Sequence, residues 1–312
     1  MRVISTEELE RTLTFPVLVD RLREAFRAAN ISAPVRQQHG IPNREAPDGT
    51  LLIMPAWQEG GHIGVKTVTV YPGNPAHARP AVMGTYILLD ARSGAPIAVM
   101  DGRLLTLRRT AAASALAASY LARRQAQRLL VVGTGALAPY LASAHSTVRP
   151  IREVVFWGRS PEKARRVAEQ WRRQDLAVSF TEDLPSAVGR ADIVSCATMA
   201  TQPLIEGAWL TPGTHIDLVG GFTRDMREAD DAAILRAVLF VDTRHGALSE
   251  AGDIIRPIET GVIREDDIAG DLFTLARGAH SGRRSDEEVT LFKSVGTALE
   301  DLVAARVATE AI

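Results

Sequence analysis

The sequence lacks the features that mark several classes of protein. It has one cysteine, Cys196, which excludes an intramolecular disulfide and favours a reducing compartment. With 36 Lys and Arg against 37 Asp and Glu, no overall charge favours nucleic acid or anionic lipid. No apolar run approaches the roughly 18 to 20 residues of a membrane span, and the N-terminus lacks the apolar core of a signal peptide. We therefore expect a cytoplasmic protein whose partners are small molecules or a second subunit.

Internal repeats and low-complexity segments are also absent from the sequence. None of the seven histidines has metal-ligand spacing to another, so we assign no metal. With 46% hydrophobic residues, the chain can bury sizeable cores without disulfides or metals. A change of pattern near residue 111 predicts that these cores belong to two domains.

The first part of the chain is predicted to contain a helix followed by strands. Residues 1 to about 30 are predicted to be helical, with Thr14 as the N-cap and Pro16 in the first turn. One face of this helix carries an apolar stripe of Leu18, Leu22, Ala25, Phe26 and Ala29. Strands are predicted at 50–56, 62–70, 84–90 and 97–100. Because no helices separate these strands, we expect a largely antiparallel sheet.

From about residue 111 strands alternate with helices, which predicts a parallel, doubly wound sheet. The strands are predicted at 129–132, 154–157, 192–197, 215–220 and 238–242. A last long helix is expected to begin at Ser285, which has capping-box spacing to Glu288, and to pack on the N-terminal domain.

The expected fold is therefore α/β, with a Rossmann-type doubly wound parallel sheet and a second α+β domain. We expect residues 113–287 to form the NAD(P)-binding Rossmann domain. The N-terminal segment and the C-terminal helix, residues 1–112 with 288–312, are expected to form a substrate-binding and dimerisation domain.

A glycine-rich turn follows the predicted strand at 129–132. Gly133, Gly135 and Ala138 form the pattern G-x-G-x-x-A before a predicted helix. The first glycine permits a tight turn, the second lets the backbone approach a pyrophosphate, and the small third residue allows close packing. The helix start then offers free N–H groups to the anion. This strand-turn-helix setting favours a dinucleotide site over a plain structural turn.

The end of the next strand bears on the choice of nucleotide. NAD enzymes carry an acidic residue there, about 20 residues after the first glycine. This chain instead reads Phe-Trp-Gly-Arg-Ser-Pro at 156–161. Arg159 can neutralise a 2′-phosphate and Ser160 can donate beside it, so we expect NADP(H) rather than NAD(H). The alternative is that Arg159 is a solvated loop arginine.

Basic residues in the first part are candidate ligands of an anion. Lys66 lies within an otherwise apolar, β-branched strand, where a lysine is unfavourable unless an anion or a solvated cavity receives it. The alternative is an edge strand from which Lys66 reaches solvent. Arg109, beside its competitor Arg108, precedes an Ala-rich helix and could hold an anion at the helix start. No local context singles out Arg36.

Seven segments in order along the chain resemble the ornithine cyclodeaminase/μ-crystallin family. They are PVRQQHG, GVKTVTVYPGN, MGTYILLDARSGAPIAVMDG, LRRTAAASALAASYLA, VVGTGALA, DLVGGFTRDMREAD and FKSVGTALEDLVAA. The family includes cyclodeaminases, alanine dehydrogenases, ketimine and pyrroline-2-carboxylate reductases, opine-forming dehydrogenases and an NADPH-binding lens protein. The resemblance implies a homodimer formed through the first domain, with the substrate between that domain and the nicotinamide.

The resemblance also implies roles for single residues. Arg36 and Lys66 match ligands of the substrate carboxylate, and Val295 matches a substrate contact. The positions that match cofactor contacts, or the junction of substrate and cofactor, are Thr85, Arg109, Ala136, Leu137, Thr198 and Val219. Leu137 stands where the family usually has glutamine, which removes a polar side chain but leaves the backbone donors.

A second departure from the family concerns the reaction. The catalytic aspartate of the cyclodeaminases falls at Phe222, and phenylalanine cannot manage the protons of two nitrogens. Reducing a preformed cyclic imine requires only an anchored carboxylate and an iminium aligned with the nicotinamide, and Phe222 would form an apolar wall for the ring.

We therefore predict an NAD(P)-dependent imine reductase that acts on Δ1-pyrroline-2-carboxylate or Δ1-piperideine-2-carboxylate. Arg36, Lys66 and Arg109 would hold the substrate carboxylate. Lys66 would also be the proton donor, because it is the one cation of the three whose pKa can fall far enough.

Other functions stay open. The chain could be an ornithine cyclodeaminase, which forms proline and ammonia with NAD, if Asp217, Asp225 or Asp253 replaces the missing aspartate. It could also be a non-catalytic NADPH-binding protein, although the retained Lys66 and Arg109 argue against this. Alanine dehydrogenase and opine-type reductase are further members of the same set.

Overall fold

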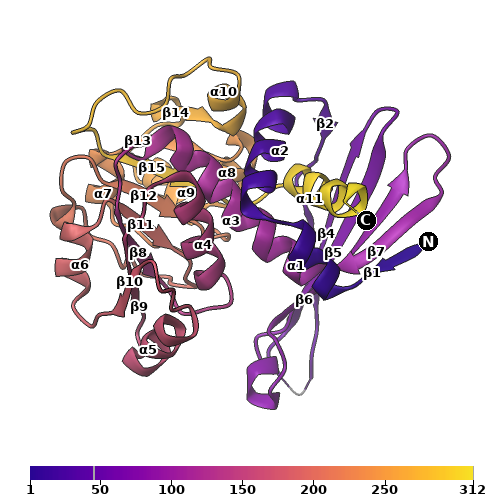
Figure 1. Cartoon of the computed structure of the whole chain (residues 1–312), viewed down its shortest axis with the longest axis horizontal. Coiled ribbons are helices and arrows are strands. Elements are labelled where there is room, and N and C mark those ends of the chain that lie inside the picture. Colours follow the sequence, from indigo (N-terminus) through magenta and orange to yellow (C-terminus); the bar gives the residue numbers. More distant parts are fainter. Residues whose placement is uncertain (45, 312) are drawn as a thin grey trace. The chain divides into compact units, whose positions relative to one another are not determined.

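The computed structural model describes residues 1–44 and 46–311, and the chain divides into two compact units (Figure 1). Unit 1 consists of Met1–Thr110 and Thr297–Ile312, and unit 2 of Ala111–Gly296. The boundary falls within helix α3 (Gly102–Leu121).

A mixed, seven-stranded sheet forms the centre of unit 1. Its order is β1-β7-β6-β5-β4-β2, with β3 also paired to β4. The strands are β1 (Arg2–Ile4), β2 (Ile31–Ser32), β3 (Gln37–Ile41), β4 (Gly49–Gln58), β5 (His62–Val70), β6 (Val82–Asp90) and β7 (Pro96–Asp101). β1 pairs with β7 in parallel. All pairs among the other strands, β2 to β7, are antiparallel. The expected antiparallel sheet is therefore confirmed, and β1, β2 and β3 add to its predicted strands.

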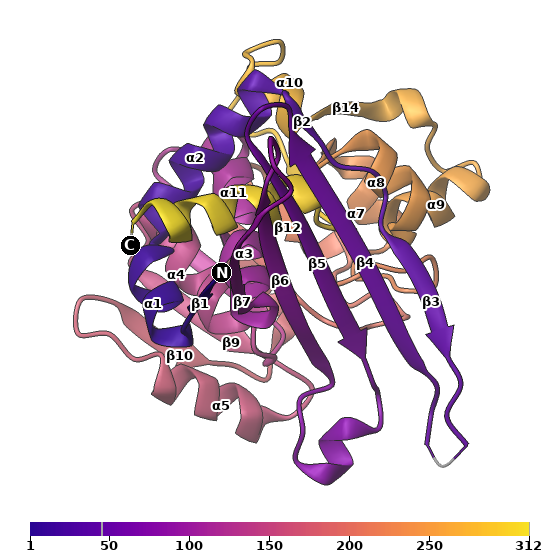
Figure 2. The ribbon, with the colours of Figure 1, turned by 90° about the vertical axis from the view of Figure 1, so that its right-hand side faces the viewer.

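The helices of unit 1 cover one face of this sheet. They are α1 (Thr6–Thr12), α2 (Phe15–Ala28) and α11 (Ala298–Glu310), with a short 3-10 helix η1 (Asn74–His77). In place of one helix over residues 1 to 30, the chain forms a strand and two helices that meet at Leu13 and Thr14. α2 packs on α11, which lies along β4, β5 and β6, as Figure 2 shows.

Unit 2 contains an eight-stranded sheet in which all pairs are parallel. Its order is β10-β9-β8-β11-β12-β15-β13-β14. The strands are β8 (Arg128–Val132), β9 (Glu153–Trp157), β10 (Ala177–Phe180), β11 (Ile193–Cys196), β12 (His215–Leu218), β13 (Val238–Val241), β14 (Ile268–Asp271) and β15 (Thr290–Lys293). Sequence order reverses direction at β8, which is the topology of a doubly wound nucleotide-binding sheet.

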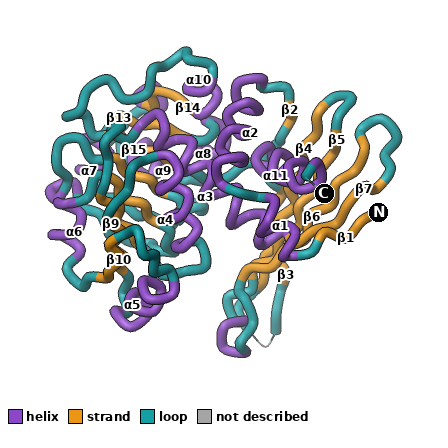
Figure 3. The backbone as a smooth tube through the Cα atoms, in the orientation of Figure 1, coloured by secondary structure: helices purple, strands orange, loops and turns teal. Residues whose placement is uncertain are grey.

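Helices cover both faces of the parallel sheet (Figure 3). They are α4 (Ala138–Val148), α5 (Pro161–Gln170), α6 (Leu184–Arg190), α7 (Asp231–Arg236), α8 (Arg244–Glu250), α9 (Gly252–Glu259) and α10 (Leu272–Ala276), with η2 (Gly207–Trp209) and η3 (Glu265–Asp267). In β8, Leu129 and Val131 belong to one buried cluster, and Leu130 and Val132 to another. Because alternate side chains of a strand point to opposite faces, the sheet separates two hydrophobic cores, as predicted for this fold.

The predicted helix from Ser285 is wrong. Ser285 Oγ does accept a hydrogen bond from the N–H of Glu288 at 3.2 Å, but no helix follows. The next residues form β15, which is buried between β12 and β13, and α11 begins only at Ala298. The run VTLFKSV fits the spacing of either a helix or a fully buried strand, and the place in the sheet decides between them.

Candidate active site

Lys66 is an internal residue of unit 1. It is 1% exposed, and both neighbours of its strand, β4 and β6, pair with it. The alternative of an edge strand with a solvated lysine is therefore wrong. Lys66 shares the buried face of β5 with Gly64 and Val68, the face on which α11 lies. An ammonium group in this position needs compensating charge.

Two buried carboxylates on α11 supply that charge. Asp301 lies 2.8 Å from Nζ of Lys66 and 2.9 Å from Nε of Arg109. Glu300 lies 2.5 Å from Nη1 of Arg109, and both acids are 0% exposed. Nζ of Lys66 also donates to Oγ1 of Thr106 at 3.2 Å. The sequence patterns predict Lys66 and Arg109 as site residues, but neither of these two acids.

The cluster of Lys66, Arg109, Glu300 and Asp301 shifts the pKa of Lys66. Burial lowers the pKa of Lys66 to about 7; the charge of Arg109 also lowers it, Asp301 opposes this, and Arg36 adds a smaller lowering. The structure thus brings Lys66 and Arg109 together around Asp301, whereas Arg36 is half-buried and acts on Lys66 through its charge. Lys66 and Arg109 pair with the two carboxylates, and a buried lysine with a pKa of about 7 can give up its proton near neutral pH.

Two other residues of unit 1 lie outside this cluster: Thr85, a predicted site residue, and Arg108, the alternative to Arg109. Thr85 is exposed on β6, opposite Thr67, and faces away from the side of the sheet that carries Lys66. The Arg108 guanidinium lies 5.3 Å from the ring centre of Phe15 on α2. Of the two adjacent arginines, Arg109 is therefore the one in the cluster.

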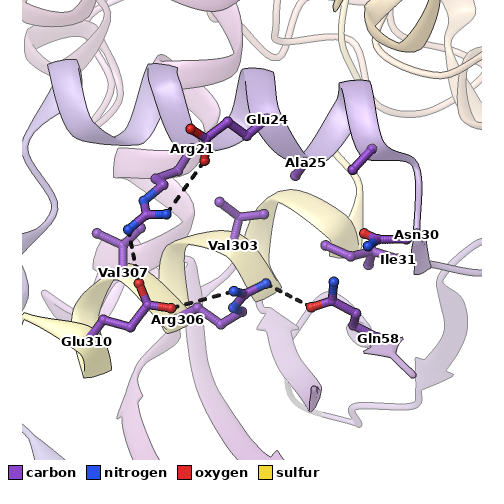
Figure 4. Close-up of a pocket in the computed structure, with 11 residues that line it drawn as sticks. Arg21, Glu24, Ala25, Asn30, Ile31, Gln58, Val303, Arg306, Val307 and Glu310 are labelled. Atoms are coloured by element: carbon purple, nitrogen blue, oxygen red, sulfur yellow. Dashed lines mark hydrogen bonds and ion pairs between the residues drawn. The ribbon is translucent and has the colours of Figure 1, made fainter. Parts of the chain in front are cut away.

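A separate hollow of unit 1 has a volume of about 140 Å³ and lies among α2, α11 and the end of β4 (Figure 4). Its charged side chains pair with one another: Arg21 lies 3.2 Å from Glu310, and Arg306 lies 3.5 Å from Glu310 and donates to Gln58 at 2.9 Å. The predicted site residues do not line it. We therefore do not assign the substrate to this hollow.

The glycine turn of unit 2 has the geometry expected of a dinucleotide site. Gly133 has a φ of 123°, and a Cβ there would lie 2.6 Å from the carbonyl oxygen of Ala197. Only glycine fits such a position. At Gly135, by contrast, a Cβ would meet no atom within 4 Å. The protein's own packing does not require the second glycine, so its open space is available to a ligand.

The start of α4 fits an anionic group beside that space. Gly135 and Ala136 are exposed, and the backbone N–H groups of Ala136 and Leu137 donate to no other described residue. No side chain caps the helix, whose first residue is Ala138. The N–H groups and the helix dipole are therefore open to a pyrophosphate, and Leu137, which lacks the usual glutamine side chain, still offers its backbone.

Arg159 and Ser160 follow the end of β9, next in the sheet to β8. Arg159 is exposed, and it forms no ion pair with the described residues. Ser160 is the N-cap of α5 and accepts from the N–H of Lys163 at 3.4 Å. Arg159 thus places a guanidinium, and Ser160 the start of a helix, at the position where doubly wound folds recognise the adenosine ribose.

The residues matched to the nicotinamide, Thr198 and Val219, and the matched substrate contact, Val295, follow the carboxyl ends of adjacent strands. Thr198 follows β11, Val219 follows β12 and Val295 follows β15. Thr198 and Phe222 are half-buried, whereas Val219 and Val295 are each 8% exposed. In doubly wound sheets ligands bind at this edge, so these residues lie where the nicotinamide end is expected.

The three aspartates considered as replacements at position 222 have other partners. Asp217 is 0% exposed and accepts from Ser195 at 2.6 Å, with His145 Nε2 at 3.1 Å. Asp225 is an exposed residue paired with Arg256 at 2.7 Å. Asp253 is 0% exposed and holds a buried ion network described below.

The described residues contain no group of three or more His, Cys, Asp or Glu side chains that could hold a metal ion. Among these same residues, no helix is long and apolar enough to cross a membrane.

Known proteins resemble this chain over nearly its whole length. The Ornithine cyclodeaminase/mu-crystallin family matches residues 2–312. A Delta(1)-pyrroline-2-carboxylate reductase of Paracoccus denitrificans is 43% identical over 279 residues, which cover 87% of this chain and 88% of that protein.

Two solved structures have a similar fold. That of Thermococcus litoralis Delta(1)-pyrroline-2-carboxylate reductase in complex with NADH and L-proline has a TM-score of 0.93 and 34% identity, and covers 99% of this chain and 97% of that one. An archaeal alanine dehydrogenase dimer with bound NAD has a TM-score of 0.90 and 29% identity, with 99% and 95% covered. With the family match over residues 2–312, these findings establish that the chain belongs to the ornithine cyclodeaminase/μ-crystallin family.

Proposed function

We propose that this protein is an NAD(P)-dependent imine reductase that converts Δ1-pyrroline-2-carboxylate or Δ1-piperideine-2-carboxylate to the cyclic amino acid. The observation that carries the proposal is the buried cluster in which Lys66, with a pKa of about 7, and Arg109 pair with two carboxylates. The identity to pyrroline-2-carboxylate reductases supports the substrate class. Unit 1 would hold the substrate and unit 2 the cofactor.

In this mechanism the cations of unit 1 bind the substrate carboxylate. NAD(P)H, when bound, supplies the hydride that the imine carbon accepts. Lys66, whose pKa is about 7, provides the proton for the imine nitrogen, so that the C=N bond becomes a C–N single bond with one hydride and one proton added. Asp301 keeps Lys66 partly protonated near neutral pH and orients its ammonium group through the 2.8 Å contact.

The region around Phe222 favours imine reduction over cyclodeamination. Cyclodeamination requires a carboxylate that exchanges protons with two nitrogens, and Phe222 cannot do so. Asp217 and Asp253 are buried with other partners, and Asp225 pairs with Arg256 at the surface. We infer that none of the three takes the place of the missing aspartate.

For the cofactor we propose NADP(H) in preference to NAD(H). Arg159 follows β9 where an NAD enzyme would carry a carboxylate, and it is exposed and available to a 2′-phosphate. The open space at Gly135 and the uncapped start of α4 support a dinucleotide of either kind. The similar structures contain NADH or NAD, so the preference rests on Arg159 and Ser160 and on the missing carboxylate at the end of β9.

We further propose a homodimer formed through unit 1. The sheet face opposite α11 carries apolar side chains that are half-buried or exposed, namely Leu51, Ile53, Trp57, Ile63, Val65, Met83, Ile87, Leu89 and Val99. Trp57 is 44% and Ile87 36% exposed. A contiguous apolar face of this kind is typical of a subunit interface, and the similar alanine dehydrogenase is a dimer.

The test is NAD(P)H oxidation by the purified protein with the two cyclic imines, beside ornithine plus catalytic NAD and a panel of 2-oxo acids with amines. We expect turnover of an imine, and its loss in Lys66→Met. Robust formation of proline and ammonia from ornithine would establish the cyclodeaminase instead. Tight NADPH binding without turnover of any substrate would favour the non-catalytic binding protein.

A further inference from the structure

A buried ion network lies in unit 2 beside the loops that follow β11 and β12. Its members, Glu228, Asp253 and Lys293, are charged residues that are each 0% exposed. Nζ of Lys293 lies 3.0 Å from Oδ2 of Asp253. Burial raises the pKa of Glu228, and the charge of Lys293 opposes this. Burying three ionisable groups is unfavourable unless each of them is paired or hydrogen-bonded.

Both oxygens of the Glu228 carboxylate accept from these loops. Oε1 accepts from the N–H of Thr198 at 2.7 Å and from its hydroxyl at 2.8 Å. Oε2 accepts from the N–H of Gly220 at 2.7 Å and from that of Gly221 at 3.4 Å. Thr198 follows β11 and the glycines follow β12, so one carboxylate joins the two strand ends.

The backbone of Glu228 is itself held on both sides. Its N–H donates to Oδ1 of Asp253 at 2.7 Å, and its carbonyl accepts from the N–H groups of Leu204 and Ile205, each at 2.9 Å. A Cβ on Gly220 would lie 2.1 Å from the carbonyl oxygen of Thr198 and 2.3 Å from Oε1 of Glu228. The two loops therefore approach as closely as glycine allows. The Glu228 carboxylate between them is held in place by its hydrogen bonds and by those of its backbone.

We propose that Glu228 is a positioning residue for the nicotinamide: its carboxylate sets the separation of the loops that carry Thr198, Val219 and Phe222. The charge of Lys293 favours the ionised form of Glu228, and Asp253 pairs with Lys293 and accepts from the N–H of Glu228. This inference rests on the proposed function, in which Thr198 and Val219 line the nicotinamide. Glu228 does not touch the reacting atoms. It acts through the loops, and it must be ionised because two oxygens receive four donors.

The variant Glu228→Gln tests this requirement at nearly constant shape. Its amide nitrogen cannot accept, so at least one loop loses its acceptor and faces a donor instead. We expect kcat to fall at least tenfold and the NAD(P)H dissociation constant, measured by nucleotide fluorescence, to rise severalfold. The KM for the imine should stay within about twofold, because the substrate carboxylate is held by unit 1.

A matched control is Asp192→Asn. Asp192 precedes β11, at the other end of the strand, and accepts from the backbone N–H groups of Gln127 and Arg128 at 2.7 and 2.9 Å. It also forms an ion pair with Arg123. Both variants remove a carboxylate that joins two segments of unit 2. We expect Asp192→Asn to lower Tm while kcat and cofactor affinity stay within about twofold.

The kinetic isotope effect with C4-deuterated cofactor separates positioning from stability. A displaced nicotinamide makes hydride transfer slower, so the effect on kcat should be larger in Glu228→Gln than in the wild type, and unchanged in Asp192→Asn. Restored kcat in Glu228→Asp would support the need for charge. Equal losses in the two variants, in proportion to Tm, would overturn the proposal.

Two provisions keep the outcome clear. If Glu228→Gln does not fold, Thr198→Val removes the hydroxyl that donates to Oε1 and accepts from the N–H of Ala200 at 3.3 Å, and an unchanged dissociation constant and isotope effect would overturn the proposal. If the wild type reduces no imine, the proposed function fails, but the dissociation constants still test Glu228. A fluorescence titration in which Glu228→Gln binds NAD(P)H like the wild type would reject the positioning role.

Discussion

Replacing Asp301 with asparagine should move the pH dependence of imine reduction. Asp301 lies 2.8 Å from Nζ of Lys66 and raises the pKa of that lysine, against the lowering by burial and by Arg109. In Asp301→Asn this support is lost and the pKa of Lys66 falls below about 7. Reduction uses protonated Lys66, so its rate is high below the pKa and declines as the pH rises through it.

The size of the change follows from the contact. An opposite charge at such a distance moves a pKa by about one to three pH units, and one unit corresponds to about 1.4 kcal/mol. With a change of about two units, the midpoint falls from about 7 to about 5. The protonated fraction at pH 7 then falls from about one half to about one hundredth, so kcat/KM falls about 50-fold at pH 7 but only about twofold at pH 5.

The assay is kcat/KM for the imine between pH 5 and 9 in the wild type and Asp301→Asn. Titration of the imine itself is common to both enzymes and cancels in their ratio. The control is Glu310→Gln, on the same helix, where Glu310 forms an exposed pair with Arg21 at 3.2 Å. Its profile should match the wild type. A loss in Asp301→Asn that is the same at every pH would refute Lys66 as the proton donor.

Three further predictions concern the cofactor, the subunit contact and the glycine turn. Arg159→Ala should raise the KM for NADPH at least tenfold and leave that for NADH nearly unchanged. The control is Arg152→Ala, at an exposed arginine before the other end of β9. An equal effect on both cofactors would contradict the phosphate role. Ile87→Lys, on the open sheet face, should give a monomer by light scattering, and a persistent dimer would argue for another interface. Gly133→Ala, at φ 123°, should lower the free energy of unfolding by about 1–3 kcal/mol. Gly135→Ala should leave Tm unchanged and weaken NAD(P)H binding. Equal losses of Tm in the two variants would contradict the open space at Gly135.

Local patterns predict most of the strands that carry the two sites. The glycines at 133 and 135 and the apolar run before them identify β8 and the start of α4, because turn geometry and strand burial are local requirements. β15 could not be predicted in this way. Its residues Thr290–Lys293 are all buried between β12 and β13, and that place depends on a sheet whose other strands lie far away in the sequence.

The buried acids were missed for a different reason. Charged pairs such as Glu300 and Asp301 usually lie on the solvated side of a helix, so their position in the sequence does not predict that they pair with the cations of unit 1. Yet the residues around them, from Ala298 to Ala308, are apolar and buried except Arg306. A helix without a polar face is an internal helix, and adjacent acids in it must meet internal cations. Lys66 and Arg109, themselves unexplained within apolar segments, were the partners that this pattern required.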